Sequence, residues 1–290
     1  MKGRSALVAG CGFLGLAVAR RLQQSGWQVV GLTHSAATAG KLADEPFLPI
    51  ACDIADPGAV ENLVTAHGGF DLVVHCASSG QGDAEDYRRV YFDGARHLLE
   101  SVRPGFMIFT SSTSVYAQVD GSWVTEDCPA EPQRETGRIL RETEDLVLAR
   151  GGAALRLSAL YGAGRSVLLR KFFHGEAVIE GDGSRWINQI HRDDAAAAVV
   201  TVAEKSAPGV FNVSDDSPLQ QSALYAFLAK QFHRPLPPVG EPNPHRKRGL
   251  TSKRVSNARL RSLGWSPLYP NFFDAVAQDS TIAEEVWSKG

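Results

Sequence analysis

The sequence lacks the features that mark metal-binding, membrane-spanning and nucleic-acid-binding proteins. Its four cysteines follow neither the CxxC nor the Cys/His spacing of a metal site. No apolar run approaches the ~20 residues that a membrane span requires, and neither repeats nor low-complexity segments are present. Because 30 basic residues nearly balance 32 acidic ones, a general nucleic-acid binder is also excluded. We therefore expect a cytoplasmic protein without a metal, whose partners are small molecules.

The length and hydrophobic content indicate a globular protein. A chain of 290 residues can form one large domain or two ordinary ones, and 43% hydrophobic residues are enough to build a core. Apolar runs of strand length alternate with helical patterns, which predicts a parallel sheet flanked by helices. The cysteines are scattered and fall mostly in or beside predicted strands, so we expect four free thiols: Cys11, Cys52, Cys76 and Cys128.

A glycine motif near the start of the chain indicates a dinucleotide-binding site. An apolar run over residues 5–9 passes into Gly10-x-Gly12-x-x-Gly15 and then into a helical pattern. Gly10 allows the tight turn, Gly12 lets the backbone approach a pyrophosphate, and Gly15 lets the helix lie close to the sheet. The helix start, at Phe13 and Leu14, then directs its N–H groups at the phosphates. The same residues also fit an ordinary glycine-rich turn.

The end of the second predicted strand, residues 27–32, should face the adenosine ribose. An acidic residue there would bind the 2′-hydroxyl of NAD and repel a 2′-phosphate, but the chain has Thr33, His34 and Ser35. These three side chains can donate hydrogen bonds to a 2′-phosphate, so we predict NADP as the preferred cofactor, with NAD possible. The basic residue usual for NADP is absent unless Lys41 approaches. Alternatively, the three residues cap the next helix.

Two further strands, over residues 47–53 and 71–77, end in residues that suit a cofactor. An aspartate at the end of the first can accept a hydrogen bond from the adenine amino group, and small residues after the second leave room for the ribose and pyrophosphate. The aspartate also fits a helix cap before Pro57. The predicted contacts are Asp53, Ile54, Cys76, Ala77 and Ser78.

The following segment carries a family resemblance. A helix predicted over residues 84–102 returns to a fifth strand, residues 106–110. That strand runs into Ser111-Ser112-Thr113-Ser114-Val115-Tyr116-Ala117, and Thr125-Glu126-Asp127-Cys128-Pro129 comes after it. Both segments resemble motifs of the extended short-chain dehydrogenase/reductases, the NAD(P)-dependent sugar epimerase/dehydratase group. The resemblance covers residues 5–280 and implies a Rossmann-type doubly wound parallel α/β sheet with a small C-terminal substrate domain.

The resemblance assigns roles in a substrate site, and one essential pair is missing. It implies that Ser112 hydrogen-bonds a substrate carbonyl or alkoxide and that Ser114 is a second polar contact. The family's tyrosine and lysine, four residues apart on one helix, transfer the proton and hold the ribose. Here those positions fall on Thr136 and Leu140, which cannot supply a titrating group or a charge. Such losses are typical of the atypical, YeeZ-like branch of the family.

The asparagine that the family places before Gly94 is also replaced, by Tyr91. If the protein is an enzyme, a bound water or another tyrosine must transfer the proton. Tyr116 lies four residues beyond Ser112, and Tyr161 begins a loop that should border the substrate. Each phenol also fits a packing role with its hydroxyl bonded to backbone.

The second half of the chain resembles the family's substrate-binding segments. Tyr161-Gly162-Ala163-Gly164-Arg165 resembles the loop between cofactor and substrate, and Arg165 is a candidate anion contact. His191, at a predicted helix start, fits acid/base catalysis but more commonly caps the helix. The basic stretch around residues 245–254 fits a solvated charge run, and Lys253, in a segment resembling the one after the substrate loop, is a candidate clamp for an anionic substrate.

These patterns lead to one fold and two functions. We expect a nucleotide-binding domain over residues 1–162 and 191–209, and a substrate domain over residues 163–190 and 210–290. The leading function is an NADP-linked epimerase, dehydratase or reductase acting on a sugar-like or small carbonyl compound. The alternative is a non-catalytic protein that senses NADP. By analogy with the family, the chain should form a homodimer.

Overall fold

The computed structural model describes residues 3–80, 82–241 and 251–283. Its centre is a seven-stranded sheet in the order β12-β7-β5-β4-β1-β2-β3, in which every neighbouring pair is parallel. The strands are β1 (Ser5–Ala9), β2 (Gln28–Thr33), β3 (Leu48–Ala51), β4 (Leu72–His75), β5 (Phe106–Ser112), β7 (Ala153–Leu157) and β12 (Gly209–Val213). The strand order reverses at β1, so the sheet is doubly wound as predicted, and ligands of such sheets bind at this reversal.

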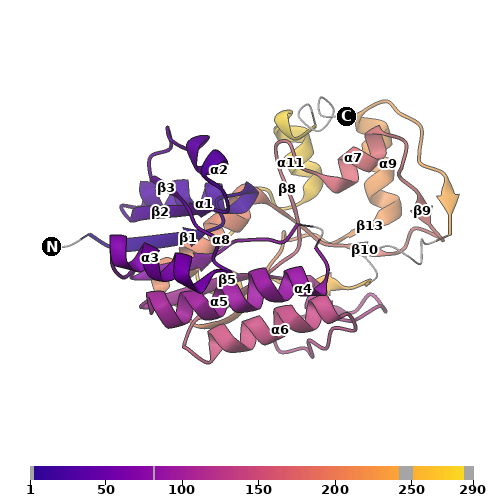
Figure 1. The fold of residues 1–290 in the computed structure, drawn as a ribbon. Helices are drawn as coiled ribbons and strands as arrows, with labels where there is room; N and C mark the ends of the chain where they lie inside the picture. The colour runs from indigo at the N-terminus through magenta and orange to yellow at the C-terminus, as the bar shows by residue number, and fades with distance from the viewer. Residues whose placement is uncertain (1–2, 81, 242–250, 284–290) are drawn as a thin grey trace.

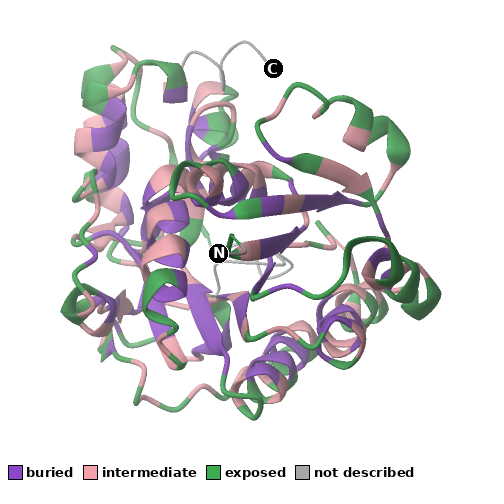
Figure 2. Cartoon of the chain, turned by 90° about the vertical axis from the view of Figure 1, so that its left-hand side faces the viewer, coloured by how far each residue is buried: buried purple, intermediate pink, exposed green. Residues whose placement is uncertain are grey.

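The central strands β1 and β4 are buried on both sides and are covered by helices on both faces of the sheet (Figure 2), whereas the edge strand β3 is partly exposed. In β1, Ala6 and Val8 belong to one hydrophobic core, whereas Leu7 and Ala9 belong to the other. The first core packs under α1 (Phe13–Gln24) and α8 (Arg192–Lys205). The second packs under α3 (Pro57–His67), α6 (Glu135–Leu148) and a long helix over residues 84–102 (Figure 1).

The long helix is divided by its hydrogen-bonding pattern into α4 (Ala84–Tyr87), η1 (Arg88–Asp93), α5 (Gly94–His97) and η2 (Leu98–Val102). The η1 and η2 stretches are π-helical, and such wider turns are frequent near functional sites. A short helix, α2 (Ala36–Gly40), connects β2 to β3. None of the helices in the described ranges is long and apolar enough to cross a membrane.

A second, smaller part of the protein lies beyond the carboxyl ends of the sheet strands (Figure 1). It has a core of its own, formed under α7 (Val167–Phe173), α9 (Gln221–Gln231) and α11 (Phe272–Gln278). The remaining short elements are β6 (Trp123–Val124), β8 (Ala159–Tyr161), β9 (Ile179–Glu180), β10 (Trp186–Ile187), β11 (Gln189–His191), β13 (Leu219–Gln220), β14 (Val239–Gly240), β15 (Arg254–Val255), α10 (Ala258–Ser262) and η3 (Thr113–Val115).

Two predicted boundaries differ from the structure. Residues 209–213 form β12 and pair with β7, so this segment belongs to the large sheet and not to the substrate domain. The sequence predicts a helix from Leu219 to Phe232 after Pro218, but α9 begins only at Gln221, because Leu219 pairs with Ile187 in the β10–β13 ladder. The four cysteines are free, as predicted.

Candidate cofactor and active site

The glycine turn between β1 and α1 has the shape that a pyrophosphate requires. Gly10 has a φ of +97°, and a Cβ there would lie 2.5 Å from the Ala77 backbone. A Cβ on Gly15 would lie 2.1 Å from the Gly10 carbonyl oxygen, so both positions need glycine for packing. A Cβ on Gly12, by contrast, would meet no atom within 4 Å. Gly12 therefore borders open space at the start of α1.

The N-terminus of α1 favours the binding of an anion. No side chain caps this helix, and its first turn contains no acidic residue. The guanidinium carbons of Arg165 and Arg192 lie 5.1 and 5.3 Å from the centre of the Phe13 ring. Positive groups thus flank N–H groups that already attract negative charge. Arg192, which also pairs with Asp193 at 2.9 Å, was not predicted, and its place at the start of α8 gave no signal.

At the end of β2 the structure corrects two of the three predicted phosphate contacts. The Thr33 side chain is buried, and its Oγ1 donates to the Ser35 carbonyl oxygen at 3.1 Å. The Ser35 Oγ accepts a hydrogen bond from the Thr38 amide and caps α2. Both hydroxyls are therefore bonded locally, which is the capping role considered as the alternative. His34 is exposed and remains available to a ligand.

A basic residue that the sequence did not predict lies at this end of the site. The Asp53 carboxylate accepts from the Ala55 amide and pairs with Arg89 at 3.1 Å and with His34 at 3.7 Å. Arg89 comes from η1 and approaches the end of β3 from the neighbouring helix. The only sequence signal was the basic pair Arg88-Arg89 near the start of the predicted helix.

The remaining predicted cofactor contacts lie around the ends of β3 and β4. Ile54 is buried in the second core, whereas Cys76, Ala77 and Ser78 follow β4 directly. Burial raises the pKa of the Cys76 thiol to about 12. The Ser78 Oγ accepts a hydrogen bond from the Tyr91 hydroxyl at 3.1 Å. Tyr91 therefore contacts the strand end beside the site, although it replaces the family's asparagine.

Ser112 ends β5 and begins the turn η3. Its Oγ accepts from the Ser114 amide at 3.1 Å, so its own O–H can donate toward a ligand. Ser112 is half-buried and Ser114 is exposed. Because β5 adjoins β4, which adjoins β1, this hydroxyl stands two strands away from the glycine turn along one edge of the sheet.

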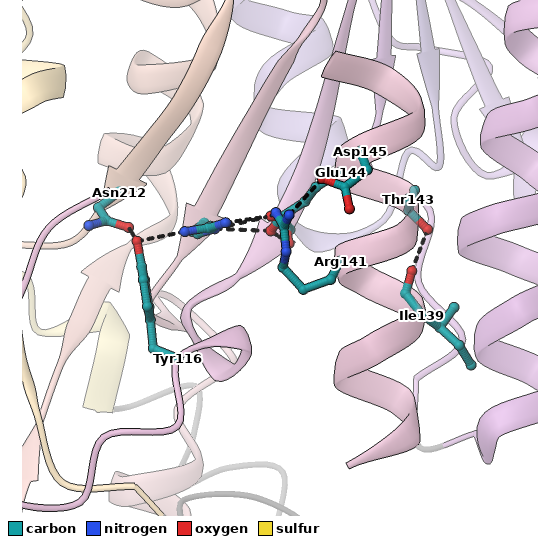
Figure 3. Close-up of polar contacts among 9 residues, drawn as sticks. Tyr116, Ile139, Arg141, Thr143, Glu144, Asp145 and Asn212 are labelled. Atoms are coloured by element: carbon teal, nitrogen blue, oxygen red, sulfur yellow. Dashed lines mark hydrogen bonds and ion pairs between the residues drawn. The ribbon is translucent and has the colours of Figure 1, made fainter. Parts of the chain in front are cut away.

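Tyr116 is not placed to transfer a proton, contrary to prediction. It is fully buried, and its hydroxyl donates to Asn212 Oδ1 at 2.9 Å and accepts from Arg156 at 2.8 Å. Arg156 in turn pairs with Glu144 at 2.7 Å, and Ser111 donates to the same carboxylate at 2.5 Å. Figure 3 shows the Tyr116 hydroxyl beside Asn212 and the Glu144 carboxylate on α6. Burial raises the phenol pKa. This network anchors α6, β5, β7 and β12 to one another, so Tyr116 has a structural role.

Tyr161 is also unsuited to the predicted role. It is 1% exposed, and its ring packs against His191 and Phe272 with centroid distances of 5.4 and 4.9 Å. Burial raises the pKa of its phenol. His191 caps α8, because its Nδ1 accepts from the Asp193 amide, which is the structural role that the sequence favoured. Burial lowers the His191 pKa.

The positions of the missing catalytic pair lie on α6. Leu140 is 5% exposed and packs in the second core, whereas Thr136 is half-buried in the first turn of the helix. Lys253, predicted to bind substrate, is 4% exposed, and its ammonium donates to protein oxygens inside the molecule. It therefore does not present its charge to a ligand at the surface. Arg165 is exposed.

Comparisons with known proteins agree with this architecture. Residues 6–214 match the model of the NAD dependent epimerase/dehydratase family. The chain is 27% identical to Protein YeeZ of Escherichia coli K12 over 280 residues, which cover 91% of this chain and 96% of that protein. Among solved structures, an NAD-dependent epimerase/dehydratase-type protein of Methylobacillus flagellatus is 28% identical, with a TM-score of 0.77 and coverage of 95% and 97%.

A UDP-glucuronic acid 4-epimerase of Bacillus cereus, solved with UDP-glucuronic acid and NAD, is 20% identical. The two structures superpose with a TM-score of 0.80 over 99% of this chain and the whole of the other. At this identity the likeness concerns the fold.

Proposed function

The chain belongs to the NAD dependent epimerase/dehydratase family, and on that premise we propose that it is an NADP-linked epimerase, dehydratase or reductase for a sugar-like or small carbonyl compound. One observation carries this proposal. The half-buried Ser112 hydroxyl, free to donate, lies at the same sheet edge as the open Gly12 turn. A dinucleotide whose pyrophosphate binds at Gly12 would extend along this edge toward Ser112.

A bound nicotinamide dinucleotide supplies a hydride donor or acceptor. The chain's own residues then have three tasks: Gly12 and the α1 amides bind the pyrophosphate, Ser112 donates to the substrate oxygen, and the substrate domain excludes water. Proton transfer has no tyrosine, because α6 carries Thr136 and Leu140 at the family positions. A missing positioned proton donor typically costs ~10²- to 10⁴-fold in rate, so we expect slow turnover through water.

The preference for NADP is part of the proposal and is supported by two basic side chains near the ends of β2 and β3. His34 is exposed, and Arg89 lies 3.1 Å from Asp53, which also approaches His34. The end of β2 itself carries no carboxylate to repel a 2′-phosphate, and the Asp53 carboxylate beside it is paired with Arg89. Asp53 retains its proposed contact with the adenine amino group.

A second candidate function, a non-catalytic NADP sensor, is favoured by the buried phenols. Tyr116 and Tyr161 are 0% and 1% exposed, and Leu140 packs in the core. In a sensor the glycine turn binds cofactor, and the substrate domain responds to its presence without hydride transfer.

The experiment that separates these functions uses one protein preparation. Calorimetric titration with NADPH, NADP, NADH and NAD measures cofactor binding. Mixing the NADPH or NADP complex with a panel of carbonyl compounds and nucleotide sugars, followed at the nicotinamide absorbance, measures single-turnover hydride transfer.

For an enzyme, we expect transfer to a panel member that Ser112→Ala slows at least tenfold and that the control Ser25→Ala, at an exposed position at the far end of α1, does not. Tight NADPH binding without transfer to any compound supports the sensor. Failure to bind any of the four dinucleotides would refute both functions.

A further inference from the structure

Among the described residues, two lysine or arginine side chains are buried, and the groups around their charges differ. Arg156, 3% exposed, pairs with the Glu144 carboxylate at 2.7 Å. Lys253, 4% exposed, donates from Nζ to Thr251 Oγ1 at 2.6 Å and to the Tyr116 carbonyl oxygen at 3.3 Å. Both acceptors are neutral, and no carboxylate of the described ranges lies within 4 Å of Nζ. Burying an ammonium without a counter-ion is costly, so such a group is a candidate for a functional role.

The Lys253 ammonium is connected to Ser112 through a single turn. Lys253 Nζ donates to the Tyr116 carbonyl, and the Tyr116 amide donates to the Thr113 carbonyl at 3.2 Å. The Ser114 amide then donates to Ser112 Oγ at 3.1 Å. Lys253 therefore fixes the far end of the turn whose near end carries the proposed substrate contact.

The backbone of Lys253 is itself held in place from two sides. The Asn188 side chain donates to the Lys253 carbonyl and accepts from the Val255 amide, each at 2.8 Å. The next residue, Arg254, pairs with Trp123 in the β6–β15 ladder. These contacts fix the Lys253 backbone, and the two hydrogen bonds of Nζ fix the ammonium.

Other charged side chains on the elements around this turn have partners of their own. They are Glu126, which accepts from a backbone amide; Glu144 and Arg156, which pair with each other; Arg254, which lies against two tryptophan rings; and Arg259, which pairs with Asp127. The Lys253 charge is thus not cancelled by a direct neighbour.

We infer that Lys253 is a positioning residue: it fixes the Ser112 turn and provides positive potential at the Ser112 hydroxyl, in place of the charge that Leu140 cannot carry. This inference rests on the proposed role of Ser112. Burial lowers the Lys253 pKa to about 8, so the charge is present at neutral pH and is lost in alkaline solution. At an effective dielectric constant of ~20, a charge on the order of 10 Å away changes an ionisation constant about tenfold.

The test introduces a titratable probe at the site. In a Ser112→Cys variant, the rate of iodoacetamide labelling as a function of pH, resolved by peptide mass spectrometry, gives the pKa of the introduced thiol. Combining it with Lys253→Met should raise that pKa by about one unit, because the thiolate loses a nearby positive charge. Lys253→Arg should keep the pKa low, and the exposed Lys205→Met is the matched control. The same thiol pKa in the Lys253→Met and Lys205→Met backgrounds would overturn the inference.

A measurement on the unsubstituted chain covers the case in which Lys253→Met does not fold. The amide resonances of Ser114 and Tyr116, followed by nuclear magnetic resonance, should shift with a midpoint near pH 8 as Lys253 loses its proton. Invariant resonances between pH 6 and 10 would contradict the inference. Neither measurement requires a cofactor. Failure to bind NADPH would therefore refute only the proposed function, and an unchanged pKa of the introduced thiol would refute only the role of Lys253.

Discussion

Adding one methyl group at Gly12 should weaken cofactor binding at least tenfold and leave the fold intact. A Cβ there meets no atom of the described residues within 4 Å, and the φ of Gly12 is −87°, which any residue can adopt. We therefore expect Gly12→Ala to change the free energy of unfolding by no more than ~0.5 kcal/mol, as for other substitutions outside the packed core. The new methyl group would occupy the space from which the pyrophosphate approaches.

The expected loss of affinity follows from the hydrogen bonds that the phosphates would lose. A hydrogen bond to a charged group contributes ~1.5–3 kcal/mol, and each 1.4 kcal/mol is tenfold in affinity. Displacing the pyrophosphate from one α1 amide should weaken NADPH binding by ~10- to 150-fold, and displacement from two amides by more. NADPH fluorescence titration measures the affinity, and urea denaturation measures the stability.

Gly15→Ala is the matched control, because it adds the same group three residues away. Its Cβ would lie 2.1 Å from the Gly10 carbonyl oxygen and 3.2 Å from the Cys76 Cβ. Overpacking of this kind costs ~1–3 kcal/mol or more, so Gly15→Ala should lower stability where Gly12→Ala does not. If Gly12→Ala unfolded the protein, or bound NADPH as tightly as the wild type, the interpretation of the glycine turn would be wrong.

Three further predictions concern cofactor choice, stability and assembly. His34→Asp should reverse the preference for NADPH over NADH, and Arg89→Gln should weaken NADPH at least fivefold more than NADH; equal effects on both cofactors in calorimetry would contradict the proposed phosphate site. Glu144→Gln leaves the buried Arg156 charge unpaired and should cost ~3–5 kcal/mol in urea denaturation, against less than ~0.5 kcal/mol for the exposed Glu142→Gln. A homodimer through α6 and the helix over residues 84–102 should scatter light with twice the 31.2 kDa mass of the chain, and a monomeric mass at micromolar concentration would exclude it.

The fold was predictable because its determinants are local in the sequence. The spacing of Gly10, Gly12 and Gly15 and the apolar runs of the strands predicted the turn, the first helix and the parallel sheet. Errors arose where a distant segment decided the local structure. The residues around Leu219 predict a helix, but Leu219 pairs with Ile187, which lies 32 positions earlier in the chain.

The candidate site was predicted less completely, for the same physical reason. Thr33 and Ser35 have the chemistry to bind phosphate, but hydrogen bonds within the turn use their hydroxyls. Tyr116 lies at a suggestive spacing from Ser112, but Arg156, 40 residues away, holds its phenol in a buried network. Arg89 reaches Asp53 across 36 positions of the sequence, and no local pattern indicates that contact.

The packing of α6 gives a physical reason for the leucine at the family's lysine position. The sequence places leucine at the family's lysine position, and the structure shows Leu140 packed in the second core. A charge at that position would be buried among apolar side chains, so its loss is consistent with the packing of α6. The same molecule nevertheless retains a buried ammonium at Lys253 that pairs with no carboxylate of the described residues and contacts the turn that begins at Ser112. Since an uncompensated buried charge destabilises the fold, its retention there is explained more simply by a role at the Ser112 turn than by a contribution to stability.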